Sequence, residues 1–234
     1  MLSTTIVTRA APATLGAVSE AIEFPTGPDR RSWEYADGFV AVSEPVEAAH
    51  EAAGEAGWTP VGNGTATFLT FLARSIDAHA VVEIGTDAGV TGLSLLEGMS
   101  EHGVLTSIDV EADRQDAARR CFQRAGFRSN RFRLISGVPL SVLPKLRDGA
   151  YDLVLVNGDR LEYVEYVSQA LRLLRHGGIV VVNDALAGSA VADPDNEDDE
   201  TLIIREALDF VADSEEFLPV LLPVGEGLLL AAKA

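Results

Sequence analysis

The chain has 234 residues, 47% of them hydrophobic, and its 36 acidic and 18 basic side chains give a formal charge of −18. This length and apolar content suffice for one α/β domain with a substantial core and a short N-terminal addition. The negative charge argues against nucleic acid and anionic membranes as partners, because both bind basic surfaces. A single cysteine, Cys121, excludes an intramolecular disulfide. With no recognisable signal peptide or membrane span, we expect a cytoplasmic protein.

The first part of the chain predicts a loosely organised segment followed by short helices. Residues 1–30 carry many small side chains and no sustained hydrophobic period, so we expect a poorly ordered or loosely docked segment before a domain over residues 31–234. Short helices are expected over Ser32–Val40 and Glu44–Gly57. The stretch WTPVGNGTATFLTFLARSI begins as a loop and should become helical at about Thr65.

From Ala80 onwards, apolar runs alternate with helical patterns. Continuous apolar strands separated by helices are typical of a parallel sheet covered on both faces, a doubly wound α/β fold. Strands are expected at 80–84, 104–109, 131–135, 151–156 and 178–183, and helices at 90–100, 112–125, 139–147, 162–175 and 199–213.

The C-terminal end departs from this alternation. Two strand-like runs, FLPVLLPV and LLLAAKA, are joined only by GEG. So short a connection can only make an antiparallel hairpin. A mostly parallel, seven-stranded sheet that ends in such a hairpin is typical of the Rossmann-like class I fold of methyltransferases that use S-adenosylmethionine (SAM). A dinucleotide-binding domain ends with another parallel strand instead.

The stretch AVVEIGTDAGVTG, residues 80–92, reads as a strand, a glycine-bearing turn and the start of a helix. Asp109 ends the next apolar run, VLTSID, where a carboxylate can accept the hydroxyls of a ribose. The spacing Glu83-x-Gly85-x-x-x-Gly89 lacks the G-x-G-x-x-G of dinucleotide sites. A carboxylate at Glu83 would also repel a pyrophosphate, so the loop favours SAM. A tight turn that binds no ligand is the alternative interpretation.

From about Trp33 to its end, the chain resembles the cation-dependent O-methyltransferases related to catechol and caffeoyl-CoA O-methyltransferases, and most of all their small bacterial branch. The resemblance implies a SAM-dependent transfer of a methyl group to a hydroxyl, and a homodimer. The matching stretches, in chain order, are WEYADGFV, TPVGNGTATFLTFLAR, VVEIGTDAGVTGLSLL, LTSIDVE, YDLVLVNGD, LLRHGGIVVVNDAL, VADPDNEDDET and LLPVGEGLLLA.

The resemblance also implies the residues that bind SAM. The carboxylate of Asp109 would bind its ribose, and Asp159 would lie near its amine. The other contacts would come from the segment before the helix near Thr65, from the glycine loop, and from the segments after the second and third strands. These residues are Val61, Asn63, Glu83, Gly85, Thr86, Gly89, Thr91, Val110, Gly137 and Val138.

The metal site of the family is altered in this chain. The family holds a Mg²⁺-like ion with an Asp after the fourth strand and an Asp-Asn pair after the fifth, which correspond here to Asn157, Asn183 and Asp184. One carboxylate in place of two would bind the ion more weakly, because Mg²⁺ prefers carboxylate oxygens. The alternative is that both asparagines only cap strand ends and helix starts. The sequence therefore leaves metal use open.

The lysine that acts as base in the family is also replaced, here by Arg160. A guanidinium is a poor general base, but it can stabilise an oxyanion. We expect Asn157 and Arg160 to act in catalysis and Asp193–Glu200 to form a solvated loop beside the acceptor site. The predicted function is methyl transfer to a hydroxyl of a small acceptor, with aromatic acceptors as one option. A SAM-binding sensor or interaction protein that has lost catalysis is the alternative.

Overall fold

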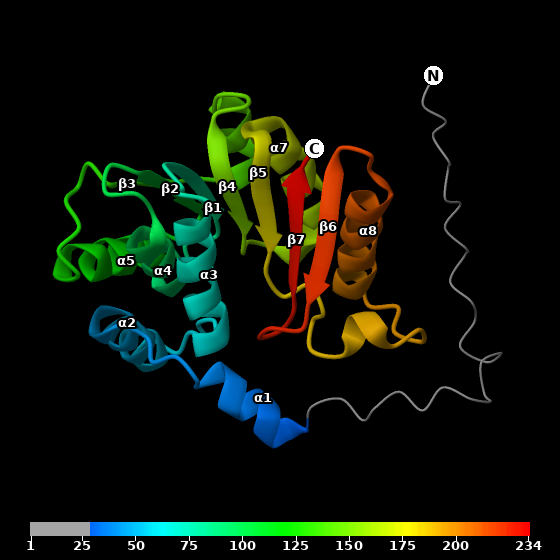
Figure 1. Cartoon of the computed structure of the whole chain (residues 1–234), viewed down its shortest axis with the longest axis horizontal. Helices are drawn as coiled ribbons and strands as arrows, with labels where there is room; N and C mark the ends of the chain where they lie inside the picture. Colours follow the sequence, from blue (N-terminus) through cyan, green and yellow to red (C-terminus); the bar gives the residue numbers. More distant parts are fainter. Residues whose placement is uncertain (1–28) are drawn as a thin grey trace. The chain divides into compact units, whose positions relative to one another are not determined.

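The computed structural model describes residues 29–234 (Figure 1). The chain divides into two units, residues 1–35 and 36–234. Helix α1 (Arg30–Asp37) begins in the first unit, where Arg30 Nε donates to Glu34 Oε1 over 2.7 Å one helical turn away. The predicted helix at Ser32–Val40 therefore begins two residues earlier and ends three residues earlier than expected. Residues 1–28 lie outside the described residues, so the prediction of a poorly ordered or loosely docked segment stays a prediction for them.

The second unit is built on a seven-stranded sheet in the order β3-β2-β1-β4-β5-β7-β6. The first five strands pair in parallel, and β7 pairs antiparallel with both β5 and β6. This confirms the predicted fold class and the terminal hairpin. The strands are β1 (Ala80–Ile84), β2 (Val104–Asp109), β3 (Phe132–Ser136), β4 (Tyr151–Val156), β5 (Leu174–Val182), β6 (Phe217–Leu222) and β7 (Leu228–Lys233).

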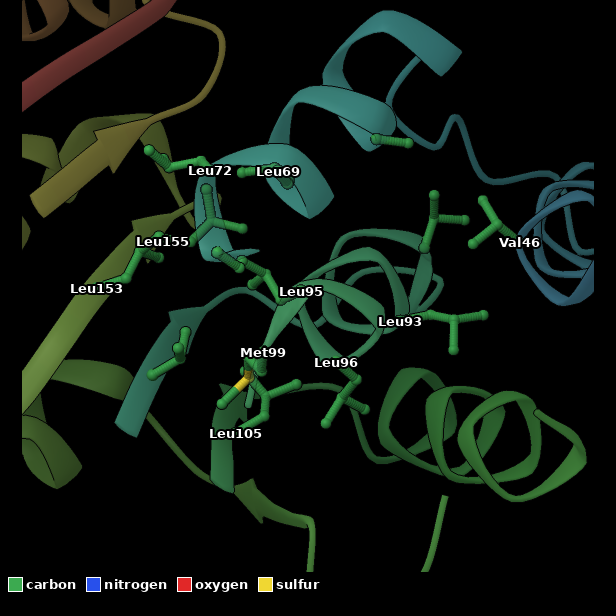
Figure 2. Packing of buried hydrophobic residues seen from close by; sticks show 14 of the residues in the cluster. Val46, Leu69, Leu72, Leu93, Leu95, Leu96, Met99, Leu105, Leu153 and Leu155 are labelled. Carbon is green, nitrogen blue, oxygen red and sulfur yellow. The ribbon is translucent and has the colours of Figure 1, made fainter. Parts of the chain in front are cut away.

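Helices cover both faces of this sheet because each central strand is apolar on both sides. In β1, Val81 packs into one core and Val82 into the other. The first core holds α2 (Glu44–Glu55), α3 (Asn63–Ser75), α4 (Val90–Gly98) and α5 (Ala112–Arg124), and Figure 2 shows its leucines packing between α3, α4 and the strands. The second core holds α6 (Pro139–Val142), α7 (Tyr163–Leu173) and α8 (Asp199–Asp213).

Other boundaries also differ from the sequence expectations, as three examples show. Helix α3 begins at Asn63, ahead of Thr65, and Asp37 Oδ1 accepts the Gly64 N–H over 2.8 Å in its first turn. The helix expected over 139–147 is split into α6 and a 3₁₀ turn, η2 (Leu143–Lys145), because Pro144 lacks the N–H that an α-helix needs. Strand β5 begins before residue 178, through a register shift opposite β4. No helix within residues 29–234 is long and apolar enough to cross a bilayer.

Candidate functional site

A cavity of about 920 Å³ opens at the carboxyl ends of the parallel strands. Its lining includes Gly85 and Asn157, where β1 and β4 adjoin, which is the point at which strand order reverses and where open α/β sheets bind ligands. Gly85, Asn157 and Asn183 follow β1, β4 and β5, and each donates its backbone N–H to a neighbouring strand over 2.8–2.9 Å. These bonds extend the backbone pairing of the strands by one residue, so the chain leaves β1, β4 and β5 at the same edge of the sheet.

The loop after β1 can only be built with glycine at its first position. Gly85 has a φ of +87°, and a Cβ there would lie 2.2 Å from the carbonyl oxygen of Asn157. Gly89 has a φ of +86°, and a Cβ there would lie 2.8 Å from the Cα of Ala118 on α5. The two glycines therefore let the loop lie close against β4 on one side and α5 on the other.

A buried polar network supports this loop from beneath. The Glu83 carboxyl accepts hydrogen bonds from the hydroxyls of Thr91 and Ser107, and Thr86 Oγ1 lies 2.6 Å from Ser107 Oγ and from Gln115 Nε2. Burial raises the pKa of Glu83 to about 8, so the group holds its proton at neutral pH. Glu83 does not line the cavity. The expectation that its charge repels a pyrophosphate is therefore wrong, although the loop spacing is as predicted.

Asp109 faces the cavity at the end of β2. Its Oδ2 accepts the backbone N–H groups of Thr86 at 2.8 Å and Asp87 at 3.2 Å, and its Oδ1 accepts that of Glu111 at 2.8 Å. These bonds fix the carboxylate against the glycine loop. Since each carboxylate oxygen has two lone pairs, Oδ1 keeps one for a ligand hydroxyl.

Several lining residues near Asp109 were not predicted from the sequence. Asp87, in the glycine loop, forms an ion pair with Arg114 Nη1 at 2.6 Å. The Arg114 guanidinium also lies 5.5 Å from the ring centroid of Trp58, which places it over an aromatic face. Behind the cavity lining, His50 Nε2 bonds to the carbonyl oxygen of Val61 at 2.8 Å and holds that lining segment in place. In the sequence, the position of Asp87 in the glycine loop was the one signal for its ion pair with Arg114.

The other end of the cavity holds the residues expected near the acceptor. Asn183 Nδ2 donates to Asn157 Oδ1 at 2.8 Å and to Asp184 Oδ1 at 3.2 Å. Arg160 Nη2 donates to Asp184 Oδ2, and Arg160 Nη1 donates to Glu200 Oε2, both at 3.0 Å. Burial alone would lower the pKa of Arg160, but the hydrogen bonds to the two carboxylates outweigh it and raise that pKa. Arg160 is therefore a permanent cation and not a base.

Two further carboxylates line this end of the cavity and were missed. Glu162 accepts a hydrogen bond from the Tyr166 hydroxyl one helical turn away, and both side chains line the cavity. Burial, reinforced by Glu162, raises the pKa of Tyr166. Glu226, from the turn between β6 and β7, also lines the cavity. The spacing of four between Glu162 and Tyr166 in DRLEYVEY occurs on many surface helices, so it gave no specific signal.

The predicted site residues fall into two groups. Those that line the cavity are Val61, Gly85, Asp109, Val110, Val138, Asn157, Asp159, Arg160, Asn183 and Asp184. Those that lie outside its lining are Asn63, Glu83, Thr86, Gly89, Thr91 and Gly137. In the second group, Glu83, Thr86 and Thr91 belong to the buried network beneath the glycine loop. The Gly137 N–H bonds to the carbonyl oxygen of Asp109 at 2.8 Å.

A mostly parallel sheet with a terminal antiparallel hairpin, a glycine loop after β1 and a carboxylate at the end of β2 define a class I SAM-dependent methyltransferase. The comparisons with known proteins identify the family. A family model described as O-methyltransferase matches residues 44–234, and the chain belongs to this family.

Relatives of known sequence or structure support the assignment. A Mycobacterium sp. (strain JLS) protein named as an O-methyltransferase is 44% identical over 199 residues, which cover 85% of this chain and 90% of the relative. A solved protein from Corynebacterium glutamicum is 31% identical, with a TM-score of 0.80 and coverage of 86% and 94%. The O-methyltransferase TomG from Streptomyces achromogenes, solved in complex with SAM, is 25% identical, with a TM-score of 0.79 and coverage of 88% and 99%.

Proposed function

We propose that the cavity binds SAM between the glycine loop and Val138 and transfers its methyl group to a hydroxyl of a small acceptor. The observation that carries the proposal is the carboxylate of Asp109, fixed by three backbone N–H groups with a lone pair left at the cavity. A ribose hydroxyl fits that lone pair. The exposed side chains of Val110 and Val138 supply apolar walls for an adenine.

The acceptor end of the cavity supplies the groups that methyl transfer needs. Bound SAM provides a methyl group on a sulfonium; as the bond to the acceptor oxygen forms, the carbon–sulfur bond breaks and its electron pair stays on sulfur. The chain's own task is alignment and removal of the hydroxyl proton. Arg160 stays protonated, and both oxygens of Asp184 accept hydrogen bonds. We assign the proton to Glu162, which lines the cavity and accepts a hydrogen bond from the Tyr166 hydroxyl at only one of its oxygens, Oε2.

The assignment of SAM contacts is tested by calorimetric titration of S-adenosylhomocysteine into wild type and Asp109→Ala. The variant should bind at least about tenfold more weakly, because one charge-assisted hydrogen bond is lost. Asp152→Ala is a matched control. Its carboxylate also accepts two backbone N–H groups, those of His79 and Ala80 at 2.8 Å, but it does not line the cavity. Equal affinities in wild type and Asp109→Ala would refute the placement.

The acceptor is sought with a panel of hydroxylated aromatics and aliphatic alcohols, each assayed for S-adenosylhomocysteine release. The alternative of a SAM-binding protein without catalysis predicts tight binding and no turnover with any member. Nothing in the comparisons supports that alternative, since the relative from Mycobacterium sp. (strain JLS) is itself named as an O-methyltransferase. A cytoplasmic location and a homodimer stay predictions from the composition and the resemblance.

A further inference from the structure

The three side chains that correspond to metal ligands form a closed hydrogen-bonded set. The amide nitrogen of Asn183, which is 4% exposed, donates to Asn157 Oδ1 and to Asp184 Oδ1. Of the two amide orientations, only this one satisfies both oxygens, because the other would place three acceptors together. The Asn183 amide N–H thus lies between Asn157 Oδ1 and Asp184 Oδ1, the two oxygens that would have to turn toward a bound cation.

The second carboxylate oxygen of Asp184 is bound to a cation that belongs to the chain. Asp184 Oδ2 accepts from Arg160 Nη2 at 3.0 Å. A divalent ion on Asp184 would lie beside this guanidinium and be repelled by it. Both carboxylate oxygens of Asp184 and the Asn157 Oδ1 already accept hydrogen bonds from the chain, so this donor set does not fit Mg²⁺, which prefers free carboxylate oxygens.

Arg160 is itself held from two sides. Its Nη1 donates to Glu200 Oε2 at 3.0 Å, and Glu200 lies in the first turn of α8. The segment before α8 is fixed in turn by Arg205, whose guanidinium donates to the carbonyl oxygens of Val191 at 3.1 Å and Asn196 at 2.7 Å. The acidic run predicted to be a solvated loop therefore places one carboxylate on Arg160.

We propose that Arg160 is the resident cation of the acceptor pocket, so that methyl transfer proceeds without a divalent metal ion. The inference rests on the proposed function. Arg160 has five N–H donors, and Asp184 and Glu200 use two of them, so the guanidinium keeps further donor capacity for an acceptor oxygen. A guanidinium so placed stabilises the oxyanion that forms as the hydroxyl loses its proton. Glu200 is a positioning residue that keeps the guanidinium at the cavity wall.

The first test measures metal binding and needs no acceptor. Mn²⁺ is titrated into the full-length protein, alone and with S-adenosylhomocysteine, and the free ion is followed by electron paramagnetic resonance. We expect no site tighter than about 1 mM. The variant Asn157→Asp, Asn183→Asp, Asp184→Asn, Arg160→Lys is the positive control and should gain one. One equivalent of tightly bound Mn²⁺ in wild type that is lost in Asp184→Ala would overturn the inference.

The second test is kinetic and uses an acceptor from the panel, in the presence of a chelator. Arg160→Ala should lower kcat by about 100-fold, and Arg160→Lys should recover part of the loss. Glu200→Gln should lower kcat by about tenfold with KM for SAM unchanged. Arg175→Ala is the matched control, since Arg175 pairs with Asp152 at 2.6 Å away from the cavity lining.

The two tests separate this inference from the proposed function. Failure of S-adenosylhomocysteine to bind would refute the proposed function, whatever the Mn²⁺ titration gives. If S-adenosylhomocysteine binds normally, two results would refute only the inference about Arg160. One is a full kcat in Arg160→Ala, and the other is loss of wild-type activity when the chelator is added.

Discussion

Gly85→Ala is the substitution for which the structure gives the sharpest expectation. A Cβ at this position would lie 2.2 Å from the carbonyl oxygen of Asn157 and 2.8 Å from the backbone nitrogen of Gly158. Ordinary contacts begin near about 3.5 Å, so the end of β4 would have to retreat by roughly 1.3 Å. The left-handed φ of +87° adds strain for any side chain.

The magnitude follows from these two effects. The left-handed conformation costs about 1–2 kcal/mol and overpacking against backbone about 1–3 kcal/mol, so we expect a loss of roughly 2–5 kcal/mol in the free energy of unfolding. For a domain of this size that corresponds to a fall in Tm of roughly 5–15 °C. Affinity for S-adenosylhomocysteine should fall as well, because the retreat moves the floor of the cavity.

Gly126→Ala is the control that separates backbone strain from steric overlap between a Cβ and the end of β4. Gly126 has nearly the same φ, +86°, but a Cβ there would meet nothing within 4 Å. It should lose only about 1–2 kcal/mol, with unchanged affinity. Thermal and urea unfolding followed by circular dichroism measure both variants. Equal losses of stability in Gly85→Ala and Gly126→Ala would refute the collision between the loop and β4.

Two further predictions concern buried or lining carboxyls. Folding raises the pKa of Glu83 from 4.5 to about 8, so between these values the native state keeps a proton that the unfolded chain has released. Stability conferred by this group is therefore present below pH 4.5 and is lost as pH rises toward 8. Glu83→Gln should reduce that loss in urea titrations at about pH 5 and pH 8, and identical pH dependence would contradict it. Glu162→Gln should lower kcat by about 100-fold with little change in affinity for S-adenosylhomocysteine, and unchanged kcat would assign the proton elsewhere.

The local pattern was enough to predict most elements and their order. A continuous apolar run such as YDLVLV is buried on both faces wherever it lies in a parallel sheet, and a three-residue connection such as GEG permits only an antiparallel hairpin. The position of Asp109 at a strand end followed for the same reason, since carboxyl ends of parallel strands meet at one edge. The errors were local, as where Pro144 ended α6 early.

What the pattern could not predict depends on groups brought together from distant parts of the chain. Glu83 reads as a charged residue at a strand end, yet it is fully buried, and burial raises its pKa to about 8 even though the hydroxyls of Thr91 and Ser107 donate to it. Arg160 reads as a replaced base, and only the packing of α8 beside it shows that Glu200 holds it as a cation. Spacing along the chain determines at which strand end a residue lies. Tertiary packing alone decides which donor or charge it meets there, because that partner can come from any element.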